Sequence, residues 1–406
     1  MASTVSMLHA NPPPGTPAIV LPGGANSLAV IWGLVDAGVP VIALVHDGDC
    51  PHRWSRFPVR RIGIRSGAAA DLLDGLARLA DEGGVIIPTA DRHVAMLSEQ
   101  EAHLREQFRL ILPRPELVAT LLDKRAEIPL MGELGIATPR SVAVLPTTPE
   151  EIVAAVGLPL IVKPRSFAHG SRLSFKTLVI RDQASLASFY AQNQARLDSL
   201  VAQEVVPGTD SDLWKCDCTF NLRSELVNGF TFQKIRMAPA HFGVSSLAIS
   251  RSHPAVLDLV AGIGRKLGYT GPMNIEFKYD ARDGQFKYIE INPRLGMCNY
   301  FDAVCGVNNA WYAYRLAMGE DLQPETPGQR DGVLYCSVLS DIATRIGDGE
   351  KPAQIARHYF RLRRHDRVGA YFRWRDPLPG LAHTTTWTVA RARGALRRVS
   401  RWIQRP

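Results

Sequence analysis

The strongest local signal in the chain lies between Asn274 and Arg294, which reads NIEFKYDARDGQFKYIEINPR. Two strand-like runs flank a turn that contains Asp283 and Gly284, which predicts a β-hairpin. If the hairpin is symmetric about Asp283, Glu276 and Glu290 lie directly opposite each other. Like charges opposed across two strands repel, so a buried pair of this kind usually has a cation between its members.

Asn292 lies two residues beyond Glu290 and therefore shares its face of the strand. Glu276, Glu290 and Asn292 offer hard oxygen ligands of the kind that suit magnesium when it also holds substrate phosphates. The alternative is a solvated acidic face on an exposed hairpin. We favour the metal site, because Arg294 adds a cation and apolar side chains are expected on the opposite face. These apolar residues are Ile275, Phe277, Ile289 and Ile291.

Two lysines end apolar runs ahead of this hairpin. Lys124 closes LLDK, and Lys163 closes LIVK. Lys163 leads into RSFAHGS (165–171), a small-residue loop whose backbone amides could close over phosphate groups. Each lysine alone could equally be an ordinary surface residue. His169 in the loop is expected either to touch a substrate or to be a solvent-exposed loop histidine.

A third signal is VAQEVVPGTDSD (201–212), where a strand ends at Pro207 and Gly208. A hinge between strand and loop can offer backbone groups to a nucleotide base, and the acids beyond it can reach ribose hydroxyls. Further along, Lys234 and Arg236 lie two residues apart on an expected strand. They either both face phosphates or an acidic substrate, or they are two solvated strand residues.

The N-terminal segment alternates strand-like and helix-like patterns, which predicts parallel strands joined by crossover helices in an open α/β domain. Gly23 and Gly24 form either a plain tight turn or a loop that presents amides to an anionic ligand. A second unit begins near Leu121 with a helix closed by Gly135. We expect an α/β domain over 1–115, an α+β region over 116–325 and a C-terminal extension over 326–406.

The 406 residues have 46% hydrophobic content and six scattered cysteines. At this length the chain should bury more than one core. The cysteines have no CxxC pairing, which argues against a disulfide framework and against a zinc site. The start of the chain does not resemble a secretory signal, and prolines and glycines interrupt the most apolar stretch. We therefore expect a cytoplasmic protein.

The net charge of +8 is concentrated at the C-terminus. Residues 351–406 hold fourteen Lys and Arg against two Asp, a net charge of +12, which leaves −4 for the first 350 residues. Arginines there accompany an apolar stripe, which predicts a basic amphipathic helix that either binds an anionic membrane surface or docks on the protein. Nucleic-acid binding is not expected, since Trp374 and Trp387 form no recognisable module with it. The stripe consists of Ala392, Leu396, Val399 and Ile403.

The order of these motifs resembles the ATP-grasp superfamily. DK, IVKP with its small-residue loop, QEVVPG, IEF and IEINPR follow one another from about Leu121 to Arg294. The segment FTFQKIRMAPAHFG, followed by EINPRLG, is similar to carboxylate-amine ligases of the D-aspartate ligase type within that superfamily. The resemblance implies an α/β domain followed by a two-subdomain ATP-grasp fold that holds adenine between its subdomains.

The resemblance also implies a role for each motif. The phosphates are contacted by Lys124, Lys163 and the loop residues His169, Gly170 and Ser171. The adenine is contacted by Gln203, Glu204, Val205 and Val206, and the ribose by Asp210 or Asp212. Magnesium is bound by Glu276, Glu290 and Asn292. Arg294 stabilises the transferred phosphoryl group, and the further catalytic candidates are Lys163, Lys234 and Arg236.

The implied chemistry activates a carboxylate with ATP as an acyl phosphate, which an amine then captures to form an amide. The substrates would be a small carboxylate and an amine, such as an amino acid and a cell-envelope or polysaccharide precursor. A carboxylase or a carboxylate-thiol ligase would share every motif. A non-catalytic nucleotide-binding protein with a polyanion- or membrane-binding tail is the alternative from another class, and a homodimer is left open.

Overall fold

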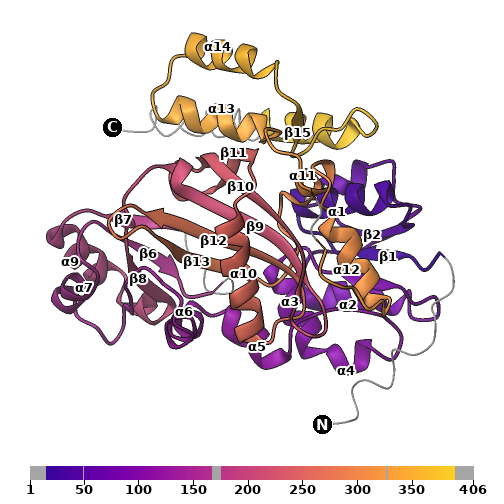
Figure 1. Ribbon diagram of the computed structural model, residues 1–406, viewed down its shortest axis with the longest axis horizontal. Helices are drawn as coiled ribbons and strands as arrows, with labels where there is room; N and C mark the ends of the chain where they lie inside the picture. Colours follow the sequence, from indigo (N-terminus) through magenta and orange to yellow (C-terminus); the bar gives the residue numbers. More distant parts are fainter. Residues whose placement is uncertain (1–14, 49, 167–174, 326–327, 389–406) are drawn as a thin grey trace, which may run out of the picture.

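The structure is a computed structural model that describes residues 15–48, 50–166, 175–325 and 328–388. Three β-sheets follow one another along the chain, and helices pack around them (Figure 1). The first sheet is parallel, and the other two contain the strands of the predicted α+β region. The predicted fold class, an open parallel sheet followed by a mixed region, is confirmed. The domain boundaries near residues 115 and 325 remain a prediction.

The first sheet has the strand order β3-β2-β1-β4. Its three apolar strands are almost completely buried, as the sequence predicts, whereas β3 alternates between half-buried and exposed residues and has no apolar run. The strands are β1 (Ala18–Val20), β2 (Val41–Val45), β3 (Arg60–Gly63) and β4 (Val85–Ile87). The helices are α1 (Ala25–Asp36), η1 (Pro51–Trp54), α2 (Ala69–Ala77), α3 (Asp91–Glu99) and α4 (Glu101–Leu104).

The turn between β1 and α1 packs tightly against the strand end of β4. A Cβ added to Gly23 would lie 2.2 Å from the hydroxyl oxygen of Thr89, so no other residue fits without a shift. Gly24 has a φ of 63°, which glycine adopts at little cost. Of the two interpretations of this pair of glycines, the structure supports the tight turn.

The second sheet is a small antiparallel sheet with the order β5-β8-β6-β7. Its inner face packs on its own helices around Leu160, Val162 and Ala202. The strands are β5 (Ser141–Ala143), β6 (Leu160–Pro164), β7 (Leu178–Ile180) and β8 (Leu200–Glu204). The helices before and around it are α5 (Pro115–Leu121), α6 (Lys124–Glu133), α7 (Pro149–Val156), α9 (Gln183–Gln192) and η2 (Gln194–Ser199).

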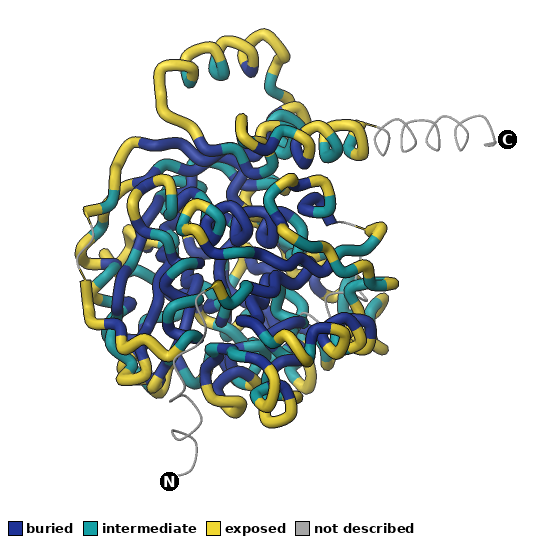
Figure 2. Tube along the Cα trace, turned by 90° about the vertical axis from the view of Figure 1, so that its right-hand side faces the viewer, coloured by how far each residue is buried: buried dark blue, intermediate teal, exposed yellow. Residues whose placement is uncertain are grey.

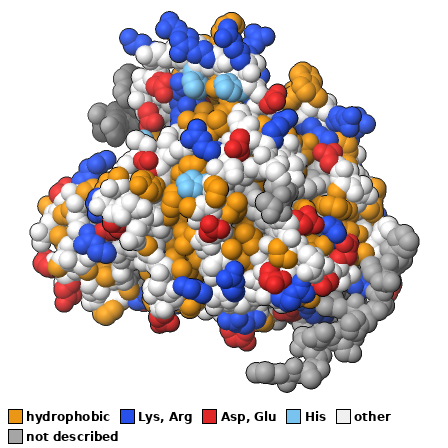
Figure 3. Space-filling model, in the orientation of Figure 1, with side chains coloured by type: hydrophobic (Ala, Val, Ile, Leu, Met, Phe, Trp, Pro, Cys, Tyr) orange, Lys and Arg blue, Asp and Glu red, His pale blue; other side chains and the backbone are white. Residues whose placement is uncertain are grey.

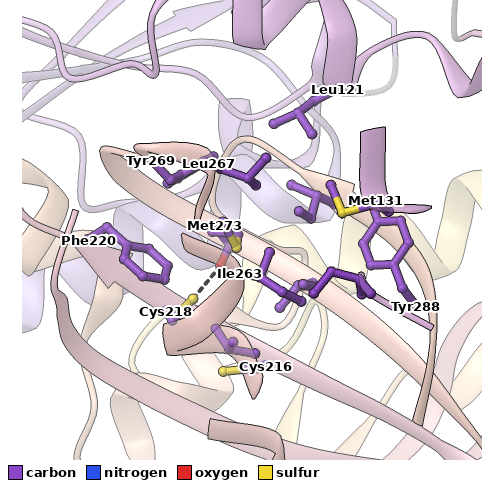
Figure 4. Close-up of a cluster of buried hydrophobic side chains, with 14 of the residues drawn as sticks. Leu121, Met131, Cys216, Cys218, Phe220, Ile263, Leu267, Tyr269, Met273 and Tyr288 are labelled. Atoms are coloured by element: carbon purple, nitrogen blue, oxygen red, sulfur yellow. Dashed lines mark hydrogen bonds between the residues drawn. The ribbon is translucent and has the colours of Figure 1, made fainter. Parts of the chain in front are cut away.

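The third sheet has seven strands in the order β13-β12-β9-β10-β11-β14-β15. Helix α10 (Pro254–Leu267) lies across it, and Figure 4 shows the cluster in which Ile263 and Leu267 meet Cys218, Phe220 and Met273. The strands are β9 (Leu213–Phe220), β10 (Leu226–Ala238), β11 (Val244–Ser250), β12 (Gly271–Asp280), β13 (Gln285–Asn292), β14 (Leu334–Cys336) and β15 (Arg367–Gly369). The remaining helices are η3 (Asp210–Asp212), α11 (Asn299–Val304), α12 (Asn309–Ala317), α13 (Val338–Gly347) and α14 (Pro352–Leu362).

The predicted hairpin is formed by β12 and β13, and Glu276 pairs with Glu290 as expected. The register shifts immediately after this pair, so Phe277 faces Tyr288 and Ile289 is the extra residue of a β-bulge. The prediction that Ile289 fills the apolar face is therefore wrong. It is half-buried and lines a cavity on the side of the two carboxylates.

The C-terminal extension contacts both the large sheet and the first sheet. Strands β14 and β15 continue the large sheet, and α13 and α14 lie at its outer edge (Figure 1). The buried carboxylate of Asp376 accepts hydrogen bonds from Trp32 Nε1 at 2.9 Å and Ser55 Oγ at 2.5 Å, beside the first sheet. The predicted amphipathic tail lies outside the described residues. Within them, no helix is long and apolar enough to cross a membrane.

Candidate functional site

A cavity of about 780 Å³ opens between the small antiparallel sheet and the large sheet. One wall is apolar and includes Ile161, Val179 and Leu213. The opposite end is polar and gathers the hairpin carboxylates, two lysines and Arg294. The cavity thus has one end suited to a flat apolar group and another suited to charged groups, as many ligand sites do.

The hairpin carboxylates lie at the polar end of the cavity. Glu276 and Glu290 are opposite each other on adjacent strands, and Asn292 Nδ2 lies 3.4 Å from Glu290 Oε1. The predicted metal ligands are therefore brought together on one side of the hairpin. Among the described residues no group of three or more His, Cys, Asp or Glu side chains could hold a metal, so an ion here would need the Asn292 amide and ligand oxygens as well.

Four lysines surround these two carboxylates. Lys234 forms an ion pair with Glu276, and Lys215 Nζ lies 3.6 Å from the second oxygen of Glu276. Lys124 Nζ lies 4.0 Å from Glu290. Lys163 belongs to the same group, and its ammonium donates to Gln203 Oε1 at 2.9 Å. The predicted lysines 124, 163 and 234 therefore all reach this site.

Charges at this end shift the pKa values of the site. Burial alone would raise the pKa of Glu290, but the nearby lysines, Lys124 first among them, lower it to about 2. Burial lowers the pKa of Lys163 to about 8, and neighbouring Lys124 acts in the same direction. Glu290 is therefore a carboxylate at neutral pH, and Lys163 begins to lose its proton just above it.

Arg294 connects the hairpin to the first sheet. Its Nε donates to Asp91 Oδ1 at 2.7 Å, and its Nη2 donates to Asn292 Oδ1 at 3.1 Å. Asp91 is the first residue of α3, which follows β4. The guanidinium is thus held beside the predicted metal ligands by the N-terminal unit, and both Arg294 and Asp91 line the cavity.

The strand end at residues 203–206 lines the other end of the cavity, as the sequence predicts. The Glu204 carboxylate is engaged by two arginines, at 2.7 Å from Arg140 and 3.5 Å from Arg282. The carboxylate is therefore engaged within the protein, and the backbone N–H of Glu204 already donates to Arg140 O at 2.9 Å. Val205 and Val206 add apolar wall.

The two candidate ribose ligands differ in position. Asp210 lines the cavity, and its Oδ1 lies 3.1 Å from Nδ1 of His241. The Asp212 carboxylate instead accepts a hydrogen bond from the backbone N–H of Thr209 at 2.6 Å and is absent from the cavity wall. Asp210 is therefore the better candidate of the two.

The prediction that Arg236 faces phosphates or an acidic substrate is wrong. It does not line the cavity, because its guanidinium forms two hydrogen bonds to the buried carboxylate of Asp341, at 2.7 and 2.9 Å. Register shifts between β10 and β11 on both sides of Arg236 break the two-residue alternation that would place it beside Lys234. His169, Gly170 and Ser171 lie outside the described residues.

Three residues of the site were missed in the sequence. Lys215 faces Glu276 across the β9–β12 ladder. Asp91 reaches Arg294 from helix α3, which follows the last strand of the first sheet in the chain. Glu127 is fully buried one helical turn after Lys124, accepts hydrogen bonds from Tyr288 Oη and from the backbone of Ile291, and has a pKa that burial raises to about 7. Of these three residues, only Glu127 could have been found from a local pattern, since it lies three residues after Lys124 and shares its helix face.

Comparisons with known proteins find similarity to enzymes that bind ATP. A family model described as the ATP binding domain of the carbamoyl-phosphate synthase L chain matches residues 230–325. D-aspartate ligase of Enterococcus faecium (strain Aus0004) is 21% identical over 253 residues, which are 56% of this chain and 56% of the ligase. The large chain of carbamoyl phosphate synthase from Gemmatimonas aurantiaca is 25% identical over 218 residues, 51% of this chain and 19% of that one. The matched region therefore spans about half the length of D-aspartate ligase and about a fifth of the length of the synthase large chain.

Solved structures give a likeness of fold at low identity. The biotin carboxylase domain of Hydrogenobacter thermophilus 2-oxoglutarate carboxylase, crystallised with MgADP, ADP and bicarbonate, matches with a TM-score of 0.62 and 15% identity, over 79% of this chain and 73% of that one. N5-carboxyaminoimidazole synthetase of Staphylococcus aureus in complex with ADP matches with a TM-score of 0.61 and 15% identity, over 80% of this chain and 82% of that one.

Proposed function

The chain has the ATP-grasp fold, and on that premise we propose that it is an ATP-dependent, ADP-forming ligase that joins a carboxylate to an amine. The observation that carries the proposal is the polar end of the cavity, where Glu276, Glu290 and Asn292 face Lys124, Lys163 and Arg294. Phosphoryl transfer is catalysed mainly by positioning and by neutralising charge, and these residues supply both. The similarity to D-aspartate ligase supports an amine as the acceptor.

The donor set at this end fits magnesium. Two carboxylates and an amide offer hard oxygens, and Glu290 stays ionised because the lysines lower its pKa to about 2. Glu276, Glu290 and Asn292 would hold the ion. Magnesium held there would supply positive charge that offsets the negative charge of the phosphates.

The remaining residues would bind and orient the nucleotide. Lys124 and Lys163 would contact the phosphates, the strand end 203–206 would meet the adenine through its backbone, and Asp210 would take the ribose. Arg294, fixed by Asp91, would stabilise the charge on the transferred phosphoryl group. The ammonium group of Lys234 would offset part of the negative charge of Glu276 at the polar end of the cavity. Arg236 has no part in this proposal.

The reaction proceeds in two steps. A carboxylate oxygen of the substrate attacks the γ-phosphorus, the bond to the β,γ-bridging oxygen breaks, and ADP leaves. The amine then attacks the acyl phosphate, inorganic phosphate leaves and the amine loses a proton. The nucleophiles are substrate groups in both steps, so the protein needs no nucleophilic side chain of its own.

A carboxylase is the second candidate, because the structural neighbours include carboxylases and one of them was crystallised with bicarbonate. In that case bicarbonate would be the carboxylate that is phosphorylated. A carboxylate-thiol ligase and a non-catalytic nucleotide-binding protein remain further alternatives. We also keep as proposals a cytoplasmic location, a homodimer, and membrane contact by the basic tail, which lies outside the described residues.

The test is ATP turnover with a panel of acceptors and donors. The protein is incubated with ATP, magnesium and pairs of amino acids, uronic acids and amines, and the products are examined by mass spectrometry. We expect ADP, phosphate and an amide, and a hydroxamate when hydroxylamine replaces the amine. AMP with pyrophosphate would redirect the proposal to adenylation, and phosphate release that depends on bicarbonate would favour the carboxylase.

A further inference from the structure

Helix α14 has a basic outer face. Arg357 and Arg361 are spaced four residues apart with Phe360 between them, so the three side chains share one side of the helix, and all three are exposed. Arg364 is exposed in the turn that follows. The helix lies at the outermost edge of the molecule, and Figure 3 shows Lys and Arg side chains gathered there (Figures 1 and 3). Within the part of the chain that the structure describes, these side chains are exposed to solvent.

The same extension exposes large apolar side chains. Phe360 is 68% exposed and Trp374 is 89% exposed. Leu378 and Leu381, in the segment after β15, are each more than half exposed. Figure 2 shows that this part of the chain is mostly exposed, in contrast to the body below it. Of these side chains Phe360 lies beside the arginines of α14, where the guanidinium of Arg363 is 5.7 Å from its ring. Exposed aromatic and aliphatic side chains on a basic surface are typical of proteins that meet a membrane interface.

Acidic side chains do little to offset this charge. Between Lys351 and Thr388 the chain holds eight Lys and Arg but only Asp366 and Asp376. Asp376 is completely buried, where its carboxylate accepts hydrogen bonds from Trp32 and Ser55. Of the two, only Asp366 is exposed, and it lies 3.7 Å from Arg330. Asp36 of α1 pairs with Arg373 at 2.6 Å, whereas no ion pair holds Arg357, Arg361 or Arg364 among the described residues.

The inner side of α14 fixes the helix to the large sheet. Ile355 is 5% exposed, and Tyr359 Oη donates to Asp341 Oδ2 at 2.8 Å. Asp341 in turn holds Arg236 of β10, whose guanidinium lies 3.2 Å from His358 Nε2. The basic face is thus presented on an ordered helix, so binding to a surface would not have to order it first.

We infer that the outer face of α14, with the exposed side chains that follow β15, binds the surface of an anionic phospholipid bilayer. Arg357, Arg361 and Arg364 would meet the headgroups, while Phe360 and Trp374 would enter the interfacial region. A nucleic acid would satisfy the arginines but would leave the exposed leucines without an apolar partner, so the composition favours lipid. This surface lies outside the ATP cavity and does not depend on the proposed reaction.

The test is sedimentation of the full chain with vesicles of phosphatidylcholine, alone or mixed with phosphatidylglycerol. A triple variant, Arg357→Gln, Arg361→Gln and Arg364→Gln, is compared with a control that loses three exposed arginines on other elements. Since each basic residue near the surface adds on the order of 1 kcal/mol, the α14 variant should bind anionic vesicles about 100-fold more weakly. The control should bind as the unchanged protein does. It carries Arg78→Gln, Arg196→Gln and Arg265→Gln.

Two results would overturn the inference. If the α14 variant and the control sediment equally with anionic vesicles, the helix is not the binding element. If Phe360→Ser with Trp374→Ser leaves vesicle binding unchanged, and a DNA duplex binds as tightly through the same arginines, the surface recognises polyanions rather than lipid. Unchanged thermal unfolding of all variants confirms that the substitutions leave the fold intact.

Discussion

Lys163 lies at the polar end of the cavity with a pKa lowered by burial to about 8. Its protonated form would attract the phosphates of ATP, so affinity should fall as pH rises through 8, by up to about tenfold per pH unit. Calorimetric titration of MgATP between pH 6.5 and 9.5 measures this. Lys163→Arg should remove the inflection, because arginine stays charged over this range. If the inflection persists in Lys163→Arg, the titration belongs to another group. Lys163→Ala should abolish ATP turnover.

The two hairpin carboxylates should respond differently to loss of charge. Glu276 is 7% exposed in its side chain and faces Lys215 and Lys234, so Glu276→Gln removes the carboxylate that pairs with the buried ammonium group of Lys234 and with the half-buried one of Lys215. We expect a loss of about 3 to 5 kcal/mol in the free energy of unfolding and a higher magnesium requirement. Glu290, 36% exposed, should lose less stability on change to Gln but all magnesium-dependent turnover. Near-normal turnover of Glu290→Gln, measured by ADP release, would contradict the site assignment.

Glu127 should make stability depend on pH. Its pKa is raised to about 7 by burial, above the ordinary 4.5, so the folded protein holds this proton more tightly than the unfolded chain. The stability from this group is complete below about pH 4.5 and is lost as pH rises through 7, with an upper bound of about 3 kcal/mol. Glu127→Gln cannot titrate and can still accept from Tyr288 and Ile291. Urea unfolding at pH 5 and pH 8 should therefore differ less in the variant, and an equal difference would refute this.

Local spacing predicted those site residues that lie on one hairpin. Glu276, Glu290 and Asn292 are neighbours through a short turn, so strand alternation was enough to bring them together. Lys215 meets Glu276 only because β9 pairs with β12, and Asp91 meets Arg294 only because the first sheet packs beside the hairpin. Such contacts depend on which elements pair although they are far apart in the sequence. The spacing of residues within one segment carries no information about that pairing.

At the scale of the element, two glycines of α10 should behave in opposite ways. A Cβ on Gly264 would lie 2.1 Å from the ring of Phe220, whereas a Cβ on Gly262 would meet nothing within 4 Å. Gly262→Ala should stabilise the helix by about 0.5 to 1 kcal/mol, because glycine is a poor helix former. Gly264→Ala should destabilise the protein by about 1 to 3 kcal/mol through overpacking. Urea unfolding measures both, and a gain in stability for Gly264→Ala would mean that the helix can move away from the sheet.

Strand irregularities explain where the element-level predictions were wrong. The bulge at Ile289 turns this side chain into the cavity, and the register shifts beside Arg236 send its guanidinium to Asp341. Strict alternation predicts the wrong face after each of these points. The apolar strands and the helices between them were predicted correctly in the first sheet, where the buried runs are continuous.

At the scale of the whole molecule, the candidate site is assembled from all three sheets. Helix α3 beside the first sheet contributes Asp91, the small sheet contributes Lys163, and the large sheet contributes the hairpin carboxylates. The order of motifs predicted this architecture through its resemblance to a known superfamily. The way residues 371–377 return to the first sheet was not predicted, because Asp376 looks like any loop acid in the sequence.

The buried carboxylate of Asp376 anchors residues 371–377 beside the first sheet. Asp376 is fully buried and accepts hydrogen bonds from Trp32 Nε1, Ser55 Oγ and the backbone N–H of Arg56, at 2.9, 2.5 and 2.9 Å. Asp376→Asn would place an amide N–H₂ among these donors, so at least one buried donor would lose its acceptor. We expect a loss of about 2 to 3 kcal/mol in stability.

The extension contacts both the first sheet and the large sheet, so weakening this anchor should also separate their unfolding. In the Asp376→Asn variant, limited proteolysis should cut within residues 371–388 before the body of the protein unfolds. The matched control is Asp366→Asn, an exposed carboxylate 77% accessible in its side chain, which should change stability by no more than about 0.5 kcal/mol. If both variants melt and are cut alike, Asp376 does not anchor the extension, and the contact between α13 and β10 through Asp341 and Arg236 must hold it in place alone.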